Sequence, residues 1–342
     1  MRTLVIYCTH NASPNLDFFL NNGGYLKDTD IDYYICFNGD VDISKYQPFT
    51  KNTNLFLVTR ENVGADFGAW SHVLLTDNLY QKYDYFILLN NTCAGPFLPI
   101  YTKDSWIKIF IDQLSNEIKL VGPTINHFYG KSHVQSYFLC TDKIGIKIGI
   151  ENNIFNNDFV SKFRNREWAS YKWEFILTYE VGFSQAILNN GYNIKCMLKG
   201  LENIDFRQVR DKNKLDFSYG SVEADMCWDN HYFGMTFHPY EVIFYKSNRN
   251  LPLVNKYKDF HDKNIQIKAR YGSGDKCVDV TDIISKMFIC DNLVIIPQNT
   301  DFNSIFTDPC FGKVKILTIS INNKIYQLEE NNQRSHFEMR LQ

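Results

Sequence analysis

Residues 54–75 read NLFLVTRENVGADFGAWSHVLL, which is an apolar run, a polar turn and then a helical pattern. Asn54–Thr59 predicts a buried strand, and apolar residues recur on one face of the helix expected over Asp66–Leu75. Gly64 and Gly68 allow a ligand or a neighbouring backbone to come close to this turn. The free N–H groups at the start of the helix can receive an anion or the edge of a ring, and its first residue can cap the helix or hydrogen-bond a ribose. Plain capping and tight packing of the helix on a sheet explain the same residues equally well.

The same alternation of strand and helix extends over the first half of the chain. Nearly continuous apolar strands that alternate with helices are typical of a mostly parallel sheet covered on both faces. The expected fold class is therefore α/β and Rossmann-like. The other strands are predicted at Leu4–Cys8, Asp32–Phe37, Asp84–Leu89, Ile118–Val121 and Gln135–Cys140, and further helices at Phe18–Leu26, at Trp106–Leu114 and within 157–189.

The C-terminal part of the chain has a different character. A stretch rich in Asn, Lys and Asp is followed by short strands separated by turns, which predicts a linker and then a small all-β sandwich module. We expect a first domain over 1–250, a linker over 251–263, the module over 264–328 and a polar tail over 329–342.

The composition is that of an ordinary globular protein. The 342 residues carry a formal net charge of −2, which argues against a dedicated nucleic-acid binder because such proteins have an excess of basic residues. The nine cysteines form no Cys-x-x-Cys pair, and no apolar run has the length of a membrane span or the form of a signal peptide. We therefore expect a cytoplasmic protein without structural zinc or a transmembrane segment. Aromatic residues reach 15%, and their rings can fill a core or stack on sugars and bases.

Polar residues directly follow four of the predicted strands. In an open α/β sheet, ligands bind at the carboxyl ends of the strands, so these residues are the first candidates for a binding site. The turn after the third strand is not a Walker loop, because no Gly-Lys-Ser/Thr follows, and the first strand lacks the glycines of a dinucleotide fingerprint. The four clusters are Thr9-His10-Asn11, Asn38-Gly39-Asp40, the segment from Arg60 to Asp66, and Asn90-Asn91-Thr92.

In this order, the clusters resemble glycosyltransferases of the GT-A fold, most closely the family-2-like and rhamnan-synthesis-like enzymes. Those enzymes share an N-x-G-x-D turn after the third strand, matched by Asn62–Asp66, and an fLNdS/T-x-x-GPF segment, matched by Asn90–Phe97. The resemblance covers about residues 1–250 and includes Val5–Asn11 and Cys36–Asp40. It implies an enzyme that transfers a sugar from a nucleotide-sugar donor to a glycan or other hydroxyl acceptor, with inversion in a single displacement.

The resemblance also assigns a candidate donor site. Enzymes of this kind bind the nucleotide on the first strands, and their metal-binding DxD motif lies at the end of the fourth. Carried over to this chain, the nucleotide-sugar site comprises Thr9, His10, Asn11, Asn38, Asp40, Arg60, Asn62, Gly64, Asp66, Asn90, Asn91 and Thr92.

The DxD position departs from the family pattern, because it reads Asn90-Asn91-Thr92. In DxD enzymes a carboxylate holds Mg²⁺ or Mn²⁺ against the diphosphate, and amide oxygens are weaker ligands. Three outcomes stay open: metal binding is weak, a cationic side chain such as Arg60 replaces the metal, or activity is lost. If Mn²⁺ or Mg²⁺ serves as a cofactor, Asn91 and His238 are the expected ligands.

Two later segments also resemble the family. One is His238–Glu241, where some GT-A enzymes place a histidine ligand, and the other is a helix. The helix over Trp173–Ser184 resembles the one that carries an acidic residue near the acceptor, where a carboxylate would take the proton of the acceptor hydroxyl. Glu180 is the first candidate for this catalytic base and Glu174 the second, although a glutamate on the solvated face of a helix fits the same pattern. The expected acceptor-binding residues are Trp228, Tyr232 and Tyr240.

Two other functions remain compatible with the sequence. The missing DxD and the appended β module suit a non-catalytic protein that keeps the GT-A fold and binds a glycan or a protein partner. A nucleotidyltransferase ranks lower, since the segment after the first strand lacks the glycine-rich basic loop of those enzymes. The C-terminal module resembles the C-terminal domain of some DnaJ-like proteins, which implies packing, acceptor binding or partner docking. No expectation for the oligomeric state follows.

Overall fold

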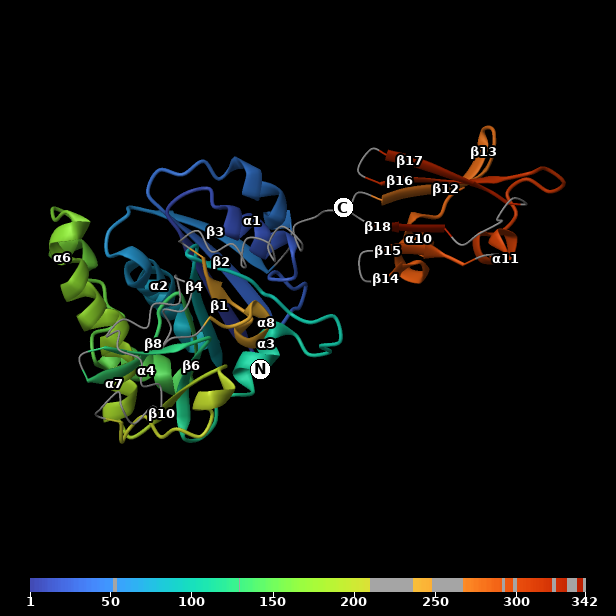
Figure 1. The fold of residues 1–342 in the computed structure, drawn as a ribbon. Coiled ribbons are helices and arrows are strands. Elements are labelled where there is room, and N and C mark those ends of the chain that lie inside the picture. The colour runs from blue at the N-terminus through green and yellow to red at the C-terminus, as the bar shows by residue number, and fades with distance from the viewer. Residues whose placement is uncertain are drawn as a thin grey trace. The chain divides into compact units, whose positions relative to one another are not determined.

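The chain forms two compact units, Met1–Asp262 and Lys263–Gln342, each with its own hydrophobic core. The computed structural model (Figure 1) describes residues 1–51, 54–128, 130–209, 236–247, 267–290, 293–297, 300–321, 324–330 and 337–340. None of the helices in these ranges combines the length and the apolar character that crossing a bilayer requires.

The first unit is built on a seven-stranded sheet with the strand order β10-β6-β9-β4-β1-β2-β3. β1 pairs in parallel with β2 and β4, β2 with β3, and β10 with β6, while β9 is antiparallel to both of its neighbours. All seven residues of β1 are buried, as its unbroken apolar run predicts. The predicted α/β class with a mostly parallel sheet is confirmed. The strands are β1 (Thr3–Thr9), β2 (Ile31–Asn38), β3 (Leu55–Arg60), β4 (Tyr85–Asn90), β6 (Ile118–Gly122), β9 (Phe138–Asp142) and β10 (Asn193–Cys196).

Helices cover both faces of this sheet. On one face, Phe19 of α1 packs against Tyr7 of β1 and Trp106 of α3, with ring centroids 5.1 and 5.8 Å apart. On the other face, Phe155 connects α2 to α7 through its contacts with Phe67 and Phe183. The helices of this unit are α1 (Pro14–Asn21), α2 (Ala65–Leu75), α3 (Trp106–Ile111), α4 (Lys143–Glu151), α5 (Phe159–Phe163), α6 (Trp168–Phe175), α7 (Gly182–Asn189) and α8 (Pro239–Val242), with shorter turns η1 (Ser44–Lys51), η2 (Thr76–Lys82) and η4 (Lys199–Leu201).

Two predicted elements are shifted in the structure. The helix expected over Phe18–Leu26 begins at Pro14, because Ser13 caps it by accepting a hydrogen bond from the N–H of Asn15, and it ends at Asn21. The strand expected over Gln135–Cys140 starts later, at Phe138. The residues before it form a hairpin of β7 (Ile125–Phe128) and β8 (Lys131–Val134).

The segment that follows α5 is one long helical stretch with a π-helical middle. The π-helical turn η3 (Ile176–Val181) joins α6 directly to α7. Short π-helical insertions of this kind occur often at functional sites, because they re-aim the side chains that they carry. Glu180 lies in this insertion.

A short strand from late in the chain completes the core of the first unit. β11 (Tyr245–Lys246) pairs antiparallel with β5 (Cys93–Ala94), which places Lys246 opposite Cys93. The preceding residue, Phe244, is buried, and its ring contacts Trp106 at 5.0 Å and Phe138 at 4.6 Å. Residues 244–246 therefore belong structurally beside the end of β4.

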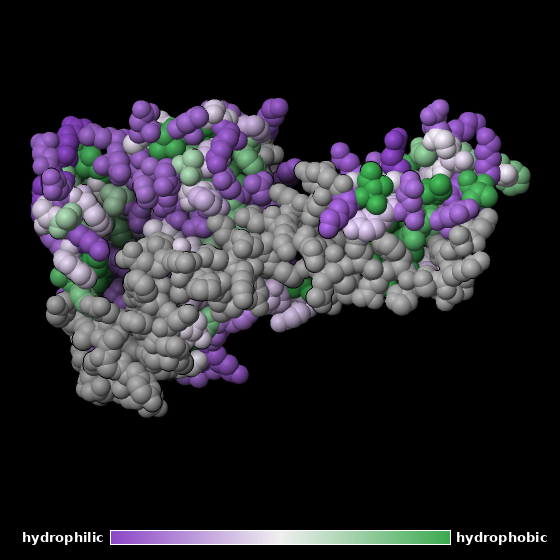
Figure 2. Space-filling view, turned by 45° about the horizontal axis from the view of Figure 1, so that its top comes forward, coloured by the Kyte–Doolittle hydropathy of each residue, from purple (hydrophilic) through white to green (hydrophobic). Residues whose placement is uncertain are grey.

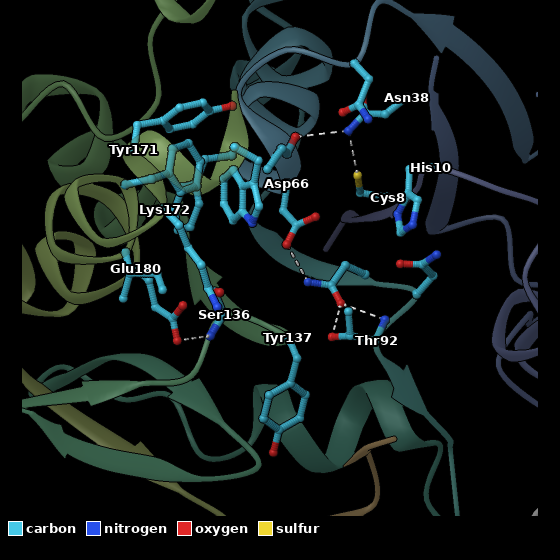
Figure 3. A pocket seen from close by; sticks show the side chains of 18 of the residues that line it. Cys8, His10, Asn38, Asp66, Thr92, Ser136, Tyr137, Tyr171, Lys172 and Glu180 are labelled. Carbon is cyan, nitrogen blue, oxygen red and sulfur yellow. Dashed lines mark hydrogen bonds between the residues drawn. The ribbon is translucent and has the colours of Figure 1, made fainter. Parts of the chain in front are cut away.

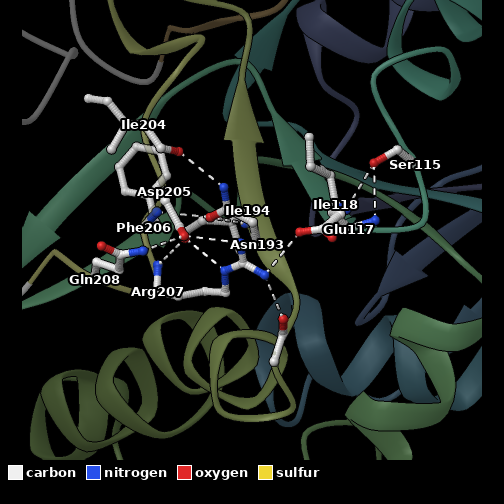
Figure 4. A network of polar contacts seen from close by, with 11 residues as sticks. Ser115, Glu117, Ile118, Asn193, Ile194, Ile204, Asp205, Phe206, Arg207 and Gln208 are labelled. Atoms are coloured by element: carbon white, nitrogen blue, oxygen red, sulfur yellow. Dashed lines mark hydrogen bonds and ion pairs between the residues drawn. The ribbon is translucent and has the colours of Figure 1, made fainter.

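Polar contacts fix the segment that follows β10 at the edge of the sheet (Figure 4). The guanidinium of Arg207 donates to Asp205 at 2.8 Å, to the carbonyl of Gly191 at 3.0 Å and to Glu117 at 3.1 Å. Asn193 accepts the N–H of Phe206 at 2.9 Å. These contacts lie away from the carboxyl ends of the strands, and we assign them a structural role.

The C-terminal unit is a separate antiparallel β region. Its two sheets have the orders β13-β12-β16-β17 and β14-β15-β18. Two helices that the sequence did not predict, α10 (Thr281–Met287) and α11 (Phe302–Phe306), pack into its core, and β18 (Phe337–Arg340) lies within the stretch expected to be a polar tail. Hydrophobic residues also show on its visible face (Figure 2). The strands are β12 (Ile267–Ser273), β13 (Lys276–Asp279), β14 (Ile289–Cys290), β15 (Leu293–Ile296), β16 (Ile316–Ile321), β17 (Lys324–Glu329) and β18.

Candidate active site

A cavity of about 590 Å³ lies at the carboxyl ends of the central strands (Figure 3). One side is formed by the ends of β1, β2 and β4 and by the start of α2. The other side is formed by the stretch from α6 to η3, and Lys246 of β11 also lines the space. Its lining residues are Cys8, His10, Asn38, Asn62, Ala65, Asp66, Phe67, Asn90, Asn91, Thr92, Ser136, Tyr137, Arg166, Trp168, Tyr171, Lys172, Phe175, Ile176, Glu180 and Lys246.

Eight of the residues predicted to bind the donor or to catalyse line this one cavity. They come from strand ends that are far apart in the sequence, and a parallel sheet brings such ends to the same edge. Glu180 reaches the cavity from the opposite side, across from Asp66. The eight are His10, Asn38, Asn62, Asp66, Asn90, Asn91, Thr92 and Glu180.

Asp66 is the carboxylate nearest to the strand ends. Its Oδ2 accepts a hydrogen bond from Nδ2 of Asn90 at 2.6 Å. The carboxylate of Asp66 is buried, whereas the residue as a whole is half-buried. Burial raises the pKa of Asp66 to about 6, and the negative charge of Glu180 acts in the same direction. A carboxyl group with this pKa exchanges its proton close to neutral pH.

The segment at the family's DxD position uses its amide groups for internal contacts. Oδ1 of Asn90 accepts from both the N–H and the hydroxyl of Thr92, at 2.9 and 2.6 Å. The Nδ2 of Asn91 donates to Oδ1 of Asn11 at 2.9 Å. Both acceptor positions of the Asn90 amide oxygen are thus occupied, so this oxygen is not offered to a metal ion.

Among the residues that the structure describes, the side chains at this position fit a divalent cation poorly. Mg²⁺ and Mn²⁺ bind carboxylate oxygens in preference to amides, and here no carboxylate occupies the DxD position itself. Within the described ranges, no three or more His, Cys, Asp or Glu side chains gather in a way that could hold a metal ion. The cationic side chains of Lys172 and Lys246 line the cavity instead.

Glu180 is held in place by two neighbours. Its Oε1 accepts a hydrogen bond from the main-chain N–H of Ser136 at 3.2 Å, and Nε2 of His133 lies 3.8 Å away. The side chain is 19% exposed, which leaves its carboxylate open to the cavity. Burial lowers the pKa of His133, an effect that the negative charge of Glu180 partly opposes. Glu180 therefore has a defined orientation and a free approach from the cavity.

Glu174, the second candidate for the base, lies elsewhere. Its exposed carboxylate pairs with Arg166 at 2.8 Å and does not line the cavity. The structure brings only Glu180 together with the predicted donor residues.

Several other predicted donor residues support the cavity from outside. The hydroxyl of Thr9 donates to the carbonyl of Asn11 at 2.7 Å, which shapes the turn after β1. Arg60 donates to Oδ1 of Asn38 at 2.6 Å and to the carbonyl of Val63 at 2.8 Å, and burial lowers its pKa. Arg60 therefore connects the ends of β2 and β3 and does not line the cavity.

Gly64 and Asp40 also lie outside the lining. Gly64 is the N-terminal cap of α2 with a φ of +75°, and a Cβ on it would come within 2.3 Å of Phe159. Its small size serves tight packing against α5, the alternative that the sequence left open. Asp40 is exposed in the turn after β2.

Of the residues expected to bind the acceptor or a metal, Asn91 lines the cavity, whereas His238 and Tyr240 do not. Nδ1 of His238 accepts the N–H of Tyr240 at 3.2 Å, and the two rings meet edge to face. This contact caps α8, and neither residue lines the cavity. Trp228 and Tyr232 lie outside the described residues.

The cavity also contains residues that the sequence did not single out as a site. Trp168, Tyr171 and Phe175 line its α6 side together with Lys172, and their amphipathic spacing was the only signal in the sequence. Lys246 lies at the cavity because β11 pairs with β5, and no local sequence pattern predicts this pairing.

The comparison with family models identifies the chain. A model described as Rhamnan synthesis protein F matches residues 34–223, which is more than half of the chain. Fold and family together define a glycosyltransferase-like protein. The chain belongs to the rhamnan synthesis protein F family, and the predicted resemblance is confirmed. The likeness of the C-terminal module to DnaJ-like proteins stays a prediction, because the match ends before it.

Curated proteins yield no match to this chain. Among solved structures, a cytidylyltransferase from Leptospira borgpetersenii is 11% identical, with 43% of this chain and 63% of that one covered and a TM-score of 0.27. A glycosyltransferase involved in glycosylation of the major capsid of PBCV-1 is 14% identical, with coverages of 56% and 80% and a TM-score of 0.30. An active-site mutant of LgtC is 9% identical, with coverages of 75% and 94% and a TM-score of 0.37. The family match, and not these distant likenesses, identifies the chain.

Proposed function

We propose that this protein is a glycosyltransferase that moves a sugar from a nucleotide-sugar to a hydroxyl group of a glycan or other acceptor. One observation carries the proposal beyond family membership. The polar ends of β1, β2 and β4 and the carboxylate of Glu180, which come from distant parts of the chain, line a single cavity. Its volume of about 590 Å³ lies within the range of ligand pockets in proteins.

In this proposal the nucleotide binds at the strand ends. His10 and Asn62 are exposed at that side of the cavity and can reach a ribose or a base, while the buried Asn38 holds the wall behind them. Nδ2 of Asn38 donates to the carbonyl of Ala65 at 3.0 Å, which joins β2 to the start of α2. The donor side is therefore preorganised by contacts within the protein.

Glu180 is the proposed catalytic base. Its carboxylate takes the proton of the acceptor hydroxyl while the hydroxyl oxygen forms a bond to the anomeric carbon of the sugar. The bond between that carbon and the phosphate oxygen breaks, and the nucleoside diphosphate leaves with the electron pair. The N–H of Ser136 holds one carboxylate oxygen and leaves the other free for the proton. A single displacement of this kind inverts the anomeric centre.

The aromatic side chains along α6 suit an acceptor sugar. Trp168 lines the cavity and is 44% exposed, and Tyr171 and Phe175 lie on the same side. Aromatic faces pack against the apolar faces of sugars, so we propose this wall as part of the acceptor site.

Titration calorimetry and a transfer assay test the function together. We expect the full-length protein to bind one of the common UDP-, GDP- or dTDP-sugars and to release the corresponding nucleoside diphosphate when a suitable acceptor is present. Failure to bind any of these donors contradicts the proposal.

The Asn90-Asn91-Thr92 segment favours one other candidate, a non-catalytic protein that keeps the fold and binds a glycan. Glycan arrays combined with the transfer assay separate the two. Glycan binding without turnover by the unmodified protein would support the binding protein.

A further inference from the structure

We propose that the diphosphate of the donor is bound directly by the side chains of Lys246 and Lys172, which take the place that a divalent cation has in DxD enzymes. This inference rests on the proposed function, because it assumes that a nucleotide-sugar occupies the cavity. It concerns which groups of this chain neutralise the leaving group.

Lys246 lies beside the segment at the DxD position. β11 pairs with β5 so that Lys246 is opposite Cys93, directly after Asn90-Asn91-Thr92. The N–H of Ser247 donates to the carbonyl of Thr92 at 2.7 Å, which continues the pairing by one residue. Lys246 is therefore fixed at the strand end where a DxD motif would present its carboxylates.

A bridge from α1 strengthens this placement. Nδ2 of Asn15 donates both to the carbonyl of Asn91, at 2.8 Å, and to the hydroxyl of Ser247, at 2.9 Å. One side chain thus ties the residue after Lys246 to the DxD position. The backbone that carries the lysine cannot move away from this strand end without losing these contacts.

Lys172 faces the same space from the opposite wall. It lines the cavity from α6, while Thr92 lies on the β4 side (Figure 3). Its ammonium group is 5.6 Å from the ring centre of Trp173, an exposed position from which a flexible lysine can turn toward a bound anion. Arg166 also lines the cavity, and its guanidinium pairs with Glu174, which does not line it.

The charges of the cavity require such cations. Asp66 and Glu180 both line it, and two carboxylates repel a diphosphate in a partly dry site. Lys246 lines the same cavity as this acidic pair, and its positive charge acts to lower the pKa of Asp66. Positive side chains aimed at the leaving group supply the stabilisation that a metal ion supplies elsewhere.

The test measures binding of UDP, GDP and dTDP, and of the matching nucleosides, to the full-length protein by calorimetry with EDTA or with Mn²⁺. We expect at least one diphosphate to bind equally well in both buffers. K246Q and K172Q should each weaken its binding by about 10-fold, the usual scale of a hydrogen bond to a charged group, while nucleoside binding stays unchanged. The exposed Lys147 of α4 provides the matched control, K147Q, which should have no effect.

Charge-retaining variants protect the test against misfolding. K246R and K172R should recover part of the lost affinity, and thermal unfolding of each variant reports its fold. Diphosphate binding that disappears in EDTA and returns with Mn²⁺ would overturn the inference, as would binding that neither glutamine variant weakens. Absence of binding by all three diphosphates would instead contradict the proposed function, and the inference would fall with it.

Discussion

The carboxylate of Glu180 accepts a hydrogen bond from the main-chain N–H of Ser136 across 3.2 Å, which joins the π-helical turn η3 to the loop before β9. This contact orients the side chain from outside its own helix. The π-helical geometry and the loop together point the carboxylate into the cavity. If α6 continued as a regular α-helix, the side chain at position 180 would point in another direction.

Replacement of Glu180 by glutamine tests its role as the base. E180Q keeps the size of the side chain and can still accept the Ser136 N–H, but it cannot take a proton. We expect kcat to fall by about 10²- to 10⁴-fold with little change in the Kd for the donor. E174Q is the matched control, because Glu174 lies on the same helical stretch but outside the cavity. Equal turnover by E180Q and the unmodified protein would remove Glu180 from the mechanism.

The stability of the protein should depend on the protonation of Asp66. Its pKa is about 6 in the fold against 3.8 in the unfolded chain, so the folded state holds the proton more tightly. The resulting stabilisation is present below pH 3.8 and is lost as the pH rises through about 6. D66N removes this dependence and can still accept from Asn90. The free energy of unfolding of D66N, relative to that of the unmodified protein, should rise by about 2 kcal/mol from about pH 4 to pH 7. This figure allows for screening by water in the cavity. Urea unfolding at both pH values measures the gain, and a constant difference would contradict the prediction.

His133 should act on stability with the opposite sign. Because burial lowers its pKa below 6.5, the unfolded chain binds a proton more readily than the folded one. The stabilisation is therefore present above pH 6.5 and is lost as the pH falls through the lower pKa of the folded state. H133Q should flatten this acid-side loss in urea unfolding. It should also alter the acid limb of the kcat profile, since the ring lies 3.8 Å from Glu180. An unchanged pH dependence in both measurements would exclude a positioning role.

Arg60 should matter for stability and not for charge in the cavity. R60M breaks its hydrogen bonds to Asn38 and to the carbonyl of Val63, and it leaves two polar groups without their donor. We expect a loss of about 2 kcal/mol in the free energy of unfolding. R164Q is the control, because Arg164 forms an exposed ion pair with Glu61 and should change little. Loss of diphosphate affinity by a stably folded R60M would instead place Arg60 in the donor site.

Local patterns in the sequence predicted the sheet and one wall of the cavity. The unbroken apolar run of β1 indicates a strand buried on both faces. The residues that follow parallel strands lie at the same edge of the sheet. Asn38, Asp66 and Asn90 could therefore be assigned to one site without a structure. The assignment of Glu180 as a candidate base depended on the family resemblance, because no local sequence pattern distinguishes it from other glutamates in helices.

The remaining features depend on contacts that sequence spacing does not encode. The position of Lys246 follows from strand pairing between residues far apart in the chain. Arg60 and Gly64 lie at the carboxyl end of β3, where a ligand contact was predicted. Arg60 instead hydrogen-bonds to Asn38 and Val63, and Gly64 packs against Phe159, so both residues support the fold. The hairpin of β7 and β8 was missed because its strands are short and adjoin a predicted strand.

The pairing of β11 with β5 also shows that the first unit needs residues beyond the family match. The family match ends at residue 223, yet Phe244 fills the space between Trp106 and Phe138, and Lys246 closes one side of the cavity. A protein truncated at the matched boundary would retain the four polar clusters after the strands and Glu180, and it would lose both a core ring and a cationic wall. The functional unit therefore extends at least to Ser247, beyond the segment by which the family is recognised.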